Sequence, residues 1–329
     1  MIKKLILAIV VIASALTVNA QSPKRTRPVS VIFDTDMGPD YDDVGAITIL
    51  HYYADQGKAK ILATMASTRY ARVAEVLSVL NTYFKMPNIP IGVPGNDAPD
   101  HSDFQKWSDT LVAKYPHQIK SNADGVDAIK LYRKILAKQP DHSVTIITVG
   151  FFNNISNLLQ SPADENSPLT GQQLVDKKVL KMVSMAGKFP SGNEFNMNQV
   201  PAATKYVFAH FTRPVIFSGF EIGAKIHAGL PLIHNKNITN SPVKDVFRIS
   251  IPQAKEDSLG RMSWDETAVV VGINGVGPYF KTVQGKVVIN DDGSNNWDTK
   301  GNHYYLEFAR PASEVQTLIN NLIMHQPVK

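Results

Sequence analysis

Five aspartates lie between Asp34 and Asp43, directly after the apolar run 31–33. The apolar run predicts a buried strand, and the segment from Asp42 to about Gln56 predicts a helix. The acids therefore lie on a strand-to-helix turn, where α/β proteins bind their ligands. Carboxylates at such close range disfavour each other's ionised form. A hard divalent cation held by oxygen ligands, Ca²⁺ or Mg²⁺, removes this conflict, and we expect a metal site here.

The first twenty residues have the pattern of an export signal. Lys3 and Lys4 precede an apolar run from Leu5 to Val18, and the small residues of 18–20 match a signal peptidase site. The apolar run is too short for a comfortable membrane span. We expect cleavage after Ala20, export to the periplasm or the cell exterior, and no membrane association after cleavage. A retained N-terminal anchor is the alternative.

Charge and cysteine content exclude several classes of protein. The formal net charge is +5, it falls to +3 when Lys3 and Lys4 leave with the signal, and the basic residues do not cluster. No nucleic-acid partner follows from such a mild bias. The chain has no cysteine, so disulfides and thiolate metal sites are impossible and the core alone must stabilise the fold.

Short apolar runs alternate with helical patterns over most of the chain. Strands are predicted at Ile61–Met65, Ile89–Val93, Val144–Val149, Met182–Met185 and Val215–Phe217, and helices at Val73–Phe84, Asp127–Lys138 and Ala202–Phe211. This alternation favours a single α/β domain with a mainly parallel sheet flanked by helices. Residues 95–122 predict a long loop or a flap over the site. An antiparallel pair, 279–289 with 304–308, and a closing helix, 312–324, are expected at the C-terminus.

Distant motifs of the chain resemble one known family. The segment 34–38 followed by the acid pair 42–43 is similar to the signature of the inosine-uridine preferring nucleoside hydrolases, with extra residues between the glycine and the acid pair. Residues 192–196 resemble the ribose-binding segment of that family. Trp264-Asp265 resembles its last metal aspartate, and 149–154 resembles the loop whose backbone carbonyl completes the metal site. The order and separations of these motifs also match.

The resemblance implies a Rossmann-like nucleoside hydrolase domain over residues 21–329 that uses one Ca²⁺. Its reaction would be hydrolysis of the N-glycosidic bond of a small-molecule ribonucleoside to ribose and free base. The implied metal ligands are the carboxylates of Asp36, Asp43 and Asp265 and the backbone carbonyl of Asn153. Asp36 would also accept the proton of the attacking water. Members of the family commonly form homodimers or homotetramers.

The resemblance also implies the residues that bind the sugar. Asp42, Glu194 and Asn196 would hold ribose hydroxyls, with Asn193 near the 5′ position. Carboxylates and amides are suitable partners for a polyol. Glu194 and Asn196 alternate about Phe195, so we expect both to lie on one side of an extended segment.

The sequence departs from the family where the leaving base is protonated. Many purine-active members carry a histidine immediately before the last metal aspartate, but Trp264 has no titratable proton. Its indole could stack on the base instead. The glycine-flanked histidine that many members carry after the third strand is also missing, and His101, in the predicted flap, is its nearest substitute. Of the remaining acids, Asp34 either caps backbone donors or supports the metal ligands, and Asp40 is interpreted as a solvated turn acid.

Two other functions stay open at this point. Asp34 and Asp36 also resemble the first motif of the haloacid-dehalogenase phosphatases, which are magnesium enzymes, with Lys286 and the segment 291–293 as the later motifs. That interpretation leaves 193–196 and Trp264-Asp265 unexplained. The other is a non-catalytic, calcium-dependent nucleoside-binding protein. It would use the same residues, and only a turnover assay separates it from an enzyme.

Overall fold

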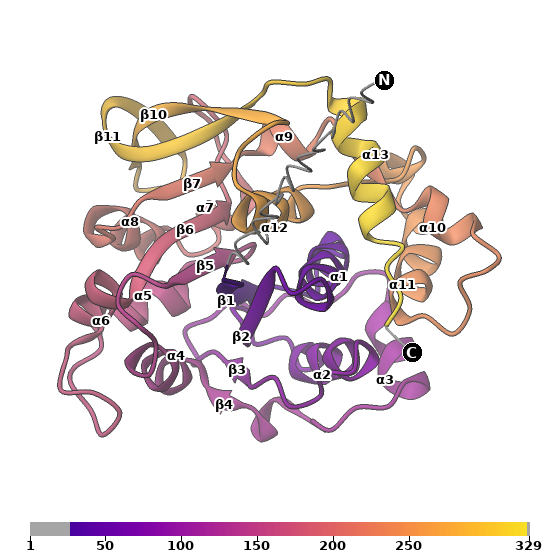
Figure 1. Ribbon diagram of the computed structural model, residues 1–329, viewed down its shortest axis with the longest axis horizontal. Helices are drawn as coiled ribbons and strands as arrows, with labels where there is room; N and C mark the ends of the chain where they lie inside the picture. The colour runs from indigo at the N-terminus through magenta and orange to yellow at the C-terminus, as the bar shows by residue number, and fades with distance from the viewer. Residues whose placement is uncertain (1–26, 328–329) are drawn as a thin grey trace, which may run out of the picture.

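One mixed sheet organises residues 27–327, the part of the chain that the computed structural model describes (Figure 1). Nine strands lie in the order β10-β11-β7-β6-β5-β1-β2-β3-β4. Neighbouring strands are parallel except for β10 and β11. The predicted α/β class, with a mainly parallel sheet in a single domain, is confirmed. The predicted export signal, 1–20, lies outside the described residues.

The strands of the large sheet are β1 (Val29–Thr35), β2 (Ala59–Ala66), β3 (Ile91–Val93), β4 (Val126–Asp127), β5 (Val144–Thr148), β6 (Val179–Met185), β7 (Val215–Ser218), β10 (Phe280–Ile289) and β11 (Asn295–Phe308). A separate antiparallel pair consists of β8 (His227–Ala228) and β9 (Arg261–Met262). β5 is buried along its whole length. Such continuous burial is expected for a parallel strand that is covered on both faces.

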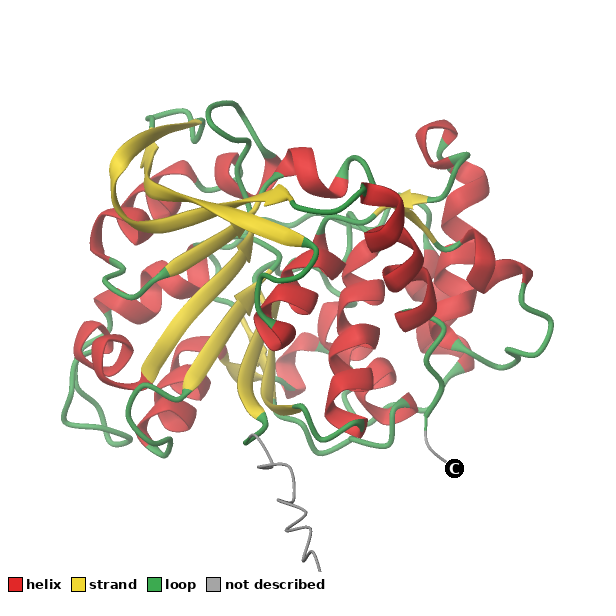
Figure 2. Cartoon of the chain, turned by 45° about the horizontal axis from the view of Figure 1, so that its top comes forward, coloured by secondary structure: helices red, strands yellow, loops and turns green. Residues whose placement is uncertain are grey.

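The α-helices are α1 (Asp42–Asp55), α2 (Val73–Tyr83), α3 (Trp107–Lys114), α4 (Ala128–Ala137), α5 (Asn153–Gln160), α6 (Gly171–Lys178), α7 (Phe195–Asn198), α8 (Pro201–His210), α9 (Phe220–Gly223), α10 (Leu230–His234), α11 (Pro242–Ser250), α12 (Asp265–Asn274) and α13 (Ala312–Leu322). Helices cover both faces of the sheet (Figure 2). Val31 and Phe33 of β1 point into one apolar core and Ile32 into the other. No helix among these described residues is long and apolar enough to span a bilayer.

Most predicted elements form near their expected bounds, and one prediction is wrong. The segment 95–122 is not a continuous loop, because residues 107–114 form α3. Trp107, Leu111 and Tyr115 are buried and lie four residues apart, which is a helical spacing. The helices that they pack against, α2 and α11, are distant in sequence. The polar residues that lie between Trp107, Leu111 and Tyr115 obscure the helical pattern in the sequence. The C-terminal antiparallel pair and the closing helix are confirmed.

His51 on α1 is a buried, uncharged histidine. Its Nε2 lies 3.0 Å from Asn81 Oδ1, and its ring stacks on Phe84 with 4.7 Å between ring centres. Burial lowers the pKa of His51 from 6.5 to about 4. The unfolded chain therefore binds a proton in this pH interval that the folded protein does not bind. The stability present above pH 6.5 is lost as the pH falls through this interval toward 4.

We expect His51→Gln to flatten the loss of stability between pH 6.5 and 4. Glutamine can keep the hydrogen bond to Asn81 but cannot bind the proton. Roughly 3 kcal/mol of the acid-induced decline should disappear. Denaturant unfolding at several pH values measures this, with exposed His210→Gln as the control variant. The same pH dependence in wild type and His51→Gln would contradict the assignment.

Candidate metal and substrate site

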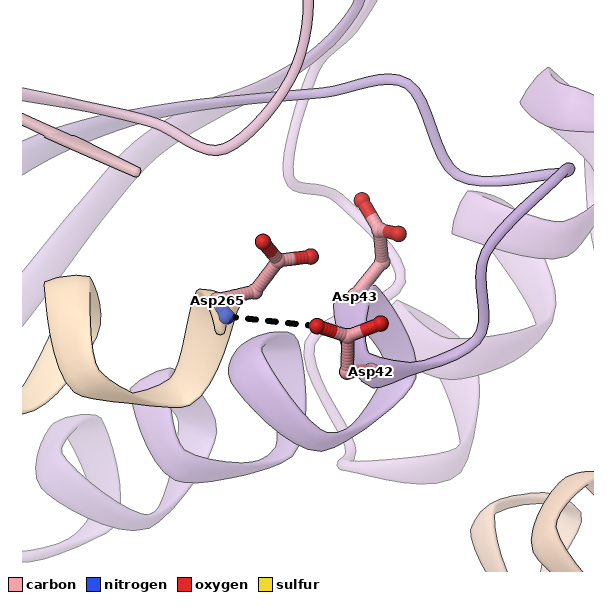
Figure 3. Close-up of side chains that lie close together, drawn as sticks. All are labelled: Asp42, Asp43 and Asp265. Atoms are coloured by element: carbon pink, nitrogen blue, oxygen red, sulfur yellow. Dashed lines mark hydrogen bonds between the residues drawn. The ribbon is translucent and has the colours of Figure 1, made fainter. Parts of the chain in front are cut away.

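Two helix N-termini meet at the acid cluster. Asp42 and Asp43 begin α1, Asp265 begins α12, and oxygen atoms of the three carboxylates lie within 4.8 Å of one another (Figure 3). All three residues are buried. Unpaired backbone N–H groups at a helix N-terminus favour negative charge. The two helices thus supply part of what holds these acids together.

Gly45 allows α1 and α12 to approach each other. A Cβ atom at this position would lie 2.2 Å from Oε1 of Glu266, which is far inside van der Waals contact. Glu266 follows Asp265 on α12 and is fully buried, and its two carboxylate oxygens have no hydrogen-bond partner among the described residues. A side chain at Gly45 would therefore collide with the Glu266 side chain and displace it from its buried position against α1.

The remaining predicted metal ligands come from the carboxyl ends of β1 and β5. Asp36 follows β1. Gly150 follows β5 in the chain and lies against the end of β1. A Cβ atom at Gly150 would be only 2.4 Å from the backbone nitrogen of Asp36. Asn153 begins α5 three residues later.

Three buried oxygens of the predicted metal ligands have no hydrogen-bond partner among the described residues. They are Oδ2 of Asp36, Oδ2 of Asp43 and Oδ1 of Asn153. Unpaired buried carboxylates are unfavourable unless a positive charge compensates them. A set of carboxylate and amide oxygens is the kind of site that binds a hard divalent cation, so these residues fit the metal that the sequence predicts.

The pKa values of the clustered aspartates also show that their ionised forms are disfavoured. Burial and the charge of Asp43 raise the pKa of Asp36 well above its usual range. Burial and the charge of Asp42 do the same to Asp43 and to Asp265. Without a cation the cluster therefore takes up protons. A bound divalent ion would favour the ionised forms instead.

Asp42 is held by groups that the sequence prediction did not include. Its Oδ1 accepts a hydrogen bond from Nε of Arg261 at 3.0 Å, and its Oδ2 accepts from the backbone nitrogens of Trp264 and Asp265 at 3.2 and 3.3 Å. Arg261 also forms an ion pair with Asp40. Asp40 is thus more than a solvated turn acid: its side chain is 42 % exposed, as that interpretation expects, but it also pairs with Arg261. Arg261 was missed because a single arginine four residues before Asp265 has no recognisable pattern.

A cavity of about 280 Å³ opens beside the acid cluster. It is lined by Asp36, Asp40, Asp42, Val149, Met185, Asn193, Glu194, Phe195, Asn196, Phe220, Glu256, Arg261, Met262, Trp264 and Asp265. All residues predicted to bind substrate are in this set. The predicted metal ligands Asp43 and Asn153 are buried but do not line the cavity.

The predicted sugar segment has a different local structure from the expected one. It is not extended, because 195–198 form the short helix α7 and Glu194 is its N-cap. Glu194 accepts hydrogen bonds from the backbone nitrogens of Asn196 (2.8 Å) and Gly187 (2.9 Å), and burial raises its pKa to about 7. The amide nitrogen of Asn196 donates to the carbonyls of Val149 and Met185, which leaves Oδ1 for a ligand. Both predicted residues are buried.

Aromatic side chains form another part of the cavity wall. The indole nitrogen of Trp264 donates to the carbonyl of Phe220 at 3.0 Å, and the two rings lie 5.4 Å apart. Phe195 is 38 % exposed. His101 does not line the cavity, but its ring lies 5.7 Å from that of Phe195 and its Nε2 is 2.7 Å from Oε1 of Gln199. The predicted flap thus contacts a cavity residue through His101.

Asp34 does not line the cavity but holds neighbouring elements in place through hydrogen bonds. It is fully buried, accepts from Tyr132 (2.7 Å) and from Asn154 (3.1 Å), and so fixes the start of α5. The alternative that it caps backbone donors is not what the structure shows. The phosphatase motifs do not assemble around Asp34, because Lys286 lies on β10, with four strands between β10 and β1. The side chain of Asp291 is 94 % exposed on the β10–β11 turn.

Comparison with known proteins gives a family match and a shared fold. A sequence model of the inosine-uridine preferring nucleoside hydrolases matches residues 31–311. No curated protein matches the chain. A solved purine-preferring ribonucleoside hydrolase from Gardnerella vaginalis is 16 % identical, with a TM-score of 0.69, over 90 % of this chain and 99 % of its own.

Two further solved structures are similar to the same extent. The plant nucleoside hydrolase PpNRh1 is 17 % identical with a TM-score of 0.66, over 90 % of this chain and 99 % of its own. An inosine-guanosine nucleoside hydrolase is 18 % identical with a TM-score of 0.66, over 91 % and 99 %. At these identities the three structures show a common fold.

We expect Gly45→Ala to destabilise the protein, although alanine is the better helix former by about 1 kcal/mol. The new methyl group would collide with the Glu266 carboxylate and displace it from its buried position against α1. Glu266→Ala should make room for it, so the double variant should recover part of the melting temperature lost in Gly45→Ala. Thermal unfolding of the two single variants and the double variant measures this coupling. Strictly additive losses would show that the contact does not set the helix spacing.

Proposed function

We propose that this chain, which belongs to the inosine-uridine preferring nucleoside hydrolase family, is a calcium-dependent ribonucleoside hydrolase. Members of this family are metal-dependent N-glycosidases that act on small-molecule nucleosides. The products would be ribose and the free base. The observation that supports the proposal most directly is the set of unpartnered buried oxygens on Asp36, Asp43 and Asn153 beside the cavity.

Asp36, Asp43 and Asp265 would hold the cation through their carboxylates, and Asn153 through an oxygen atom. The prediction assigns the backbone carbonyl of Asn153, and its unpartnered side-chain Oδ1 is the oxygen that the structure offers in addition. When bound, the ion would lower the pKa of a water molecule and orient it. Calcium suits this donor set because it accepts several oxygen ligands in a flexible geometry.

Asp36 is the proposed general base. It lines the cavity, and its Oδ2 has no other partner among the described residues. It would take one proton from the attacking water, whose oxygen then bonds to C1′ of the sugar. The C1′–N bond breaks, its electron pair leaves with the base, and the surrounding carboxylates stabilise the positive charge that develops on the sugar.

The other polar residues of the cavity would orient the ribose. Oδ1 of Asn196 has no hydrogen-bond partner among the described residues and can accept from one hydroxyl. The oxygens of Asp42 and Glu194 already accept hydrogen bonds from the protein. A carboxylate has about four lone-pair sites, so each can accept one more. Exposed Asn193 would contact the 5′ end, and Trp264 would stack on the base.

We also propose that the protein is exported, cleaved after Ala20, and assembles as a homodimer or homotetramer. The export proposal is supported by Lys3, Lys4 and the apolar run that follows. N-terminal sequencing of the exported protein tests cleavage. Size-exclusion chromatography with light scattering tests assembly.

We expect Asp43→Asn to separate metal binding from stability. Without calcium, the variant should melt at the same temperature as wild type or higher, because one repelling buried charge is gone. Calcium should stabilise wild type by about 2.7 kcal/mol at one hundred times its dissociation constant, and the variant much less. Calorimetry with and without calcium measures both effects.

A matched control is Asp245→Asn. Asp245 is also buried, but its partners are Lys114 and Tyr115. This variant should lose stability with or without calcium and keep the full calcium shift. Equal calcium shifts in wild type and Asp43→Asn would disprove the assigned ligand.

The test of the activity is a panel of ribonucleosides, with and without calcium, followed by release of reducing sugar. Ribonucleosides should be cleaved faster than their 2′-deoxy analogues by roughly a hundredfold or more, because a missing hydroxyl leaves buried polar groups unpaired. Aryl phosphates should not be cleaved. Equal rates on the two sugars would contradict the proposed roles of Asp42 and Asn196.

A further inference from the structure

Arg261 is the one basic residue among the described residues that line the cavity. It lies on β9 and is only 8 % exposed. All other charged residues of the cavity wall are acids. Asp42 and Asp40 account for the nitrogens Nε and Nη2 of this arginine, and the remaining nitrogen, Nη1, needs a separate explanation.

Acidic and aromatic side chains fix the guanidinium of Arg261 in the cavity wall. Its Nε and Nη2 lie 3.0 and 2.9 Å from Oδ1 of Asp42, and Nη2 also contacts Asp40. Its central carbon lies 4.8 Å from the ring centre of Tyr41 and 5.1 Å from that of Trp264. Two acids and two aromatic rings thus fix a planar cation beside the group proposed to stack on the base.

One guanidinium nitrogen of Arg261 has no hydrogen-bond partner among the described residues. This nitrogen is Nη1, and the acid closest to it, Asp257, is 3.8 Å away. That same Asp257 oxygen already accepts from the hydroxyl of Tyr41 at 2.5 Å. A guanidinium has five N–H groups, so Nη1 retains two that can bind a ligand. Nη1 is not one of the fully shielded unpartnered atoms of the described residues, so water or an acceptor on a bound substrate can reach it.

Such a donor suits the departure of the base, the step for which this chain lacks the histidine that many purine-active family members carry. Trp264 has no proton to give, and a guanidinium does not deprotonate in proteins, so Arg261 cannot be a general acid. A fixed charged donor can instead stabilise negative charge as it develops. The acids around Arg261 partly offset its charge but leave the Nη1 hydrogens free.

We propose that Arg261 is a catalytic residue that stabilises the leaving base through hydrogen bonds from Nη1. The proposal rests on the ribonucleoside hydrolase function argued above. The C1′–N bond breaks and its electron pair passes to the base, which departs as an anion held by Arg261. Water supplies the oxygen that bonds to C1′, Asp36 takes one water proton and returns it to solvent, and the base takes a proton from solvent.

The experiment compares Arg261→Gln and Arg261→Lys with the wild-type enzyme in calcium, on inosine and on nitrophenyl riboside. Nitrophenolate is stable as an anion and needs little help to leave, whereas hypoxanthine does need it. We expect Arg261→Gln to lower kcat on inosine by roughly a hundredfold, as removal of an oxyanion donor does elsewhere. The rate on nitrophenyl riboside should fall far less, and Arg261→Lys should be intermediate on inosine because it keeps the charge.

Asp42→Asn is the matched comparison, because Asp42 contacts Arg261 but is assigned to the sugar. It should lower the rates on both substrates by the same factor. If Arg261→Gln and Arg261→Lys do the same, Arg261 only positions Asp42 and the proposal is overturned. Melting temperatures of all variants identify losses due to unfolding, and the ratio of the two rates is independent of the folded fraction. If wild type cleaves neither substrate, the hydrolase function itself fails.

Discussion

Mutual repulsion among buried carboxylates is the constraint around which this site is built. Asp36, Asp42, Asp43 and Asp265 are each less than 5 % exposed, and burial raises the pKa of every one. Packing must therefore force them together. Gly45 admits α12 against α1, and Gly150 admits the β5–α5 loop against the backbone of Asp36. Small residues at two contacts thus convert ordinary core packing into a concentrated negative site.

The local parts of this arrangement could be predicted from the sequence. β1, the acid turn and the start of α1 are contiguous in the chain, so hydrophobic runs and acid spacing identify them without tertiary information. Asp265 and Asn153 are different, because nothing in their own neighbourhoods indicates a metal site. Resemblance to a family suggested them. The structure places Asp265 against Asp42 and Asp43, and it places Asn153 at the start of α5, after the loop that contacts Asp36.

The parts that could not be predicted depend on long-range partners. Arg261 pairs with Asp40 and Asp42, about 220 positions earlier in the chain, and a lone arginine has no pattern to reveal this. Glu194 and Asn196 were expected on an extended segment because their alternation matches a strand period. The capping of α7 by Glu194 prevailed, because its carboxylate satisfies backbone donors that a helix start leaves unpaired.

The two halves of the site have largely different supports. The acid cluster depends on α1 packing against α12, whereas the sugar segment is also fixed from β11, next to the edge strand β10. Buried Asn295 of β11 donates to the carbonyl of Lys188 and accepts from its backbone nitrogen, both at 2.9 Å, and its backbone pairs with Gly192. Arg261 and Trp264 lie between these halves and contact Asp42. Changes in β11 should therefore alter sugar contacts more than metal affinity, and the two supports meet at the β5–α5 loop, where Asn196 binds the carbonyl of Val149 and Gly150 packs against Asp36.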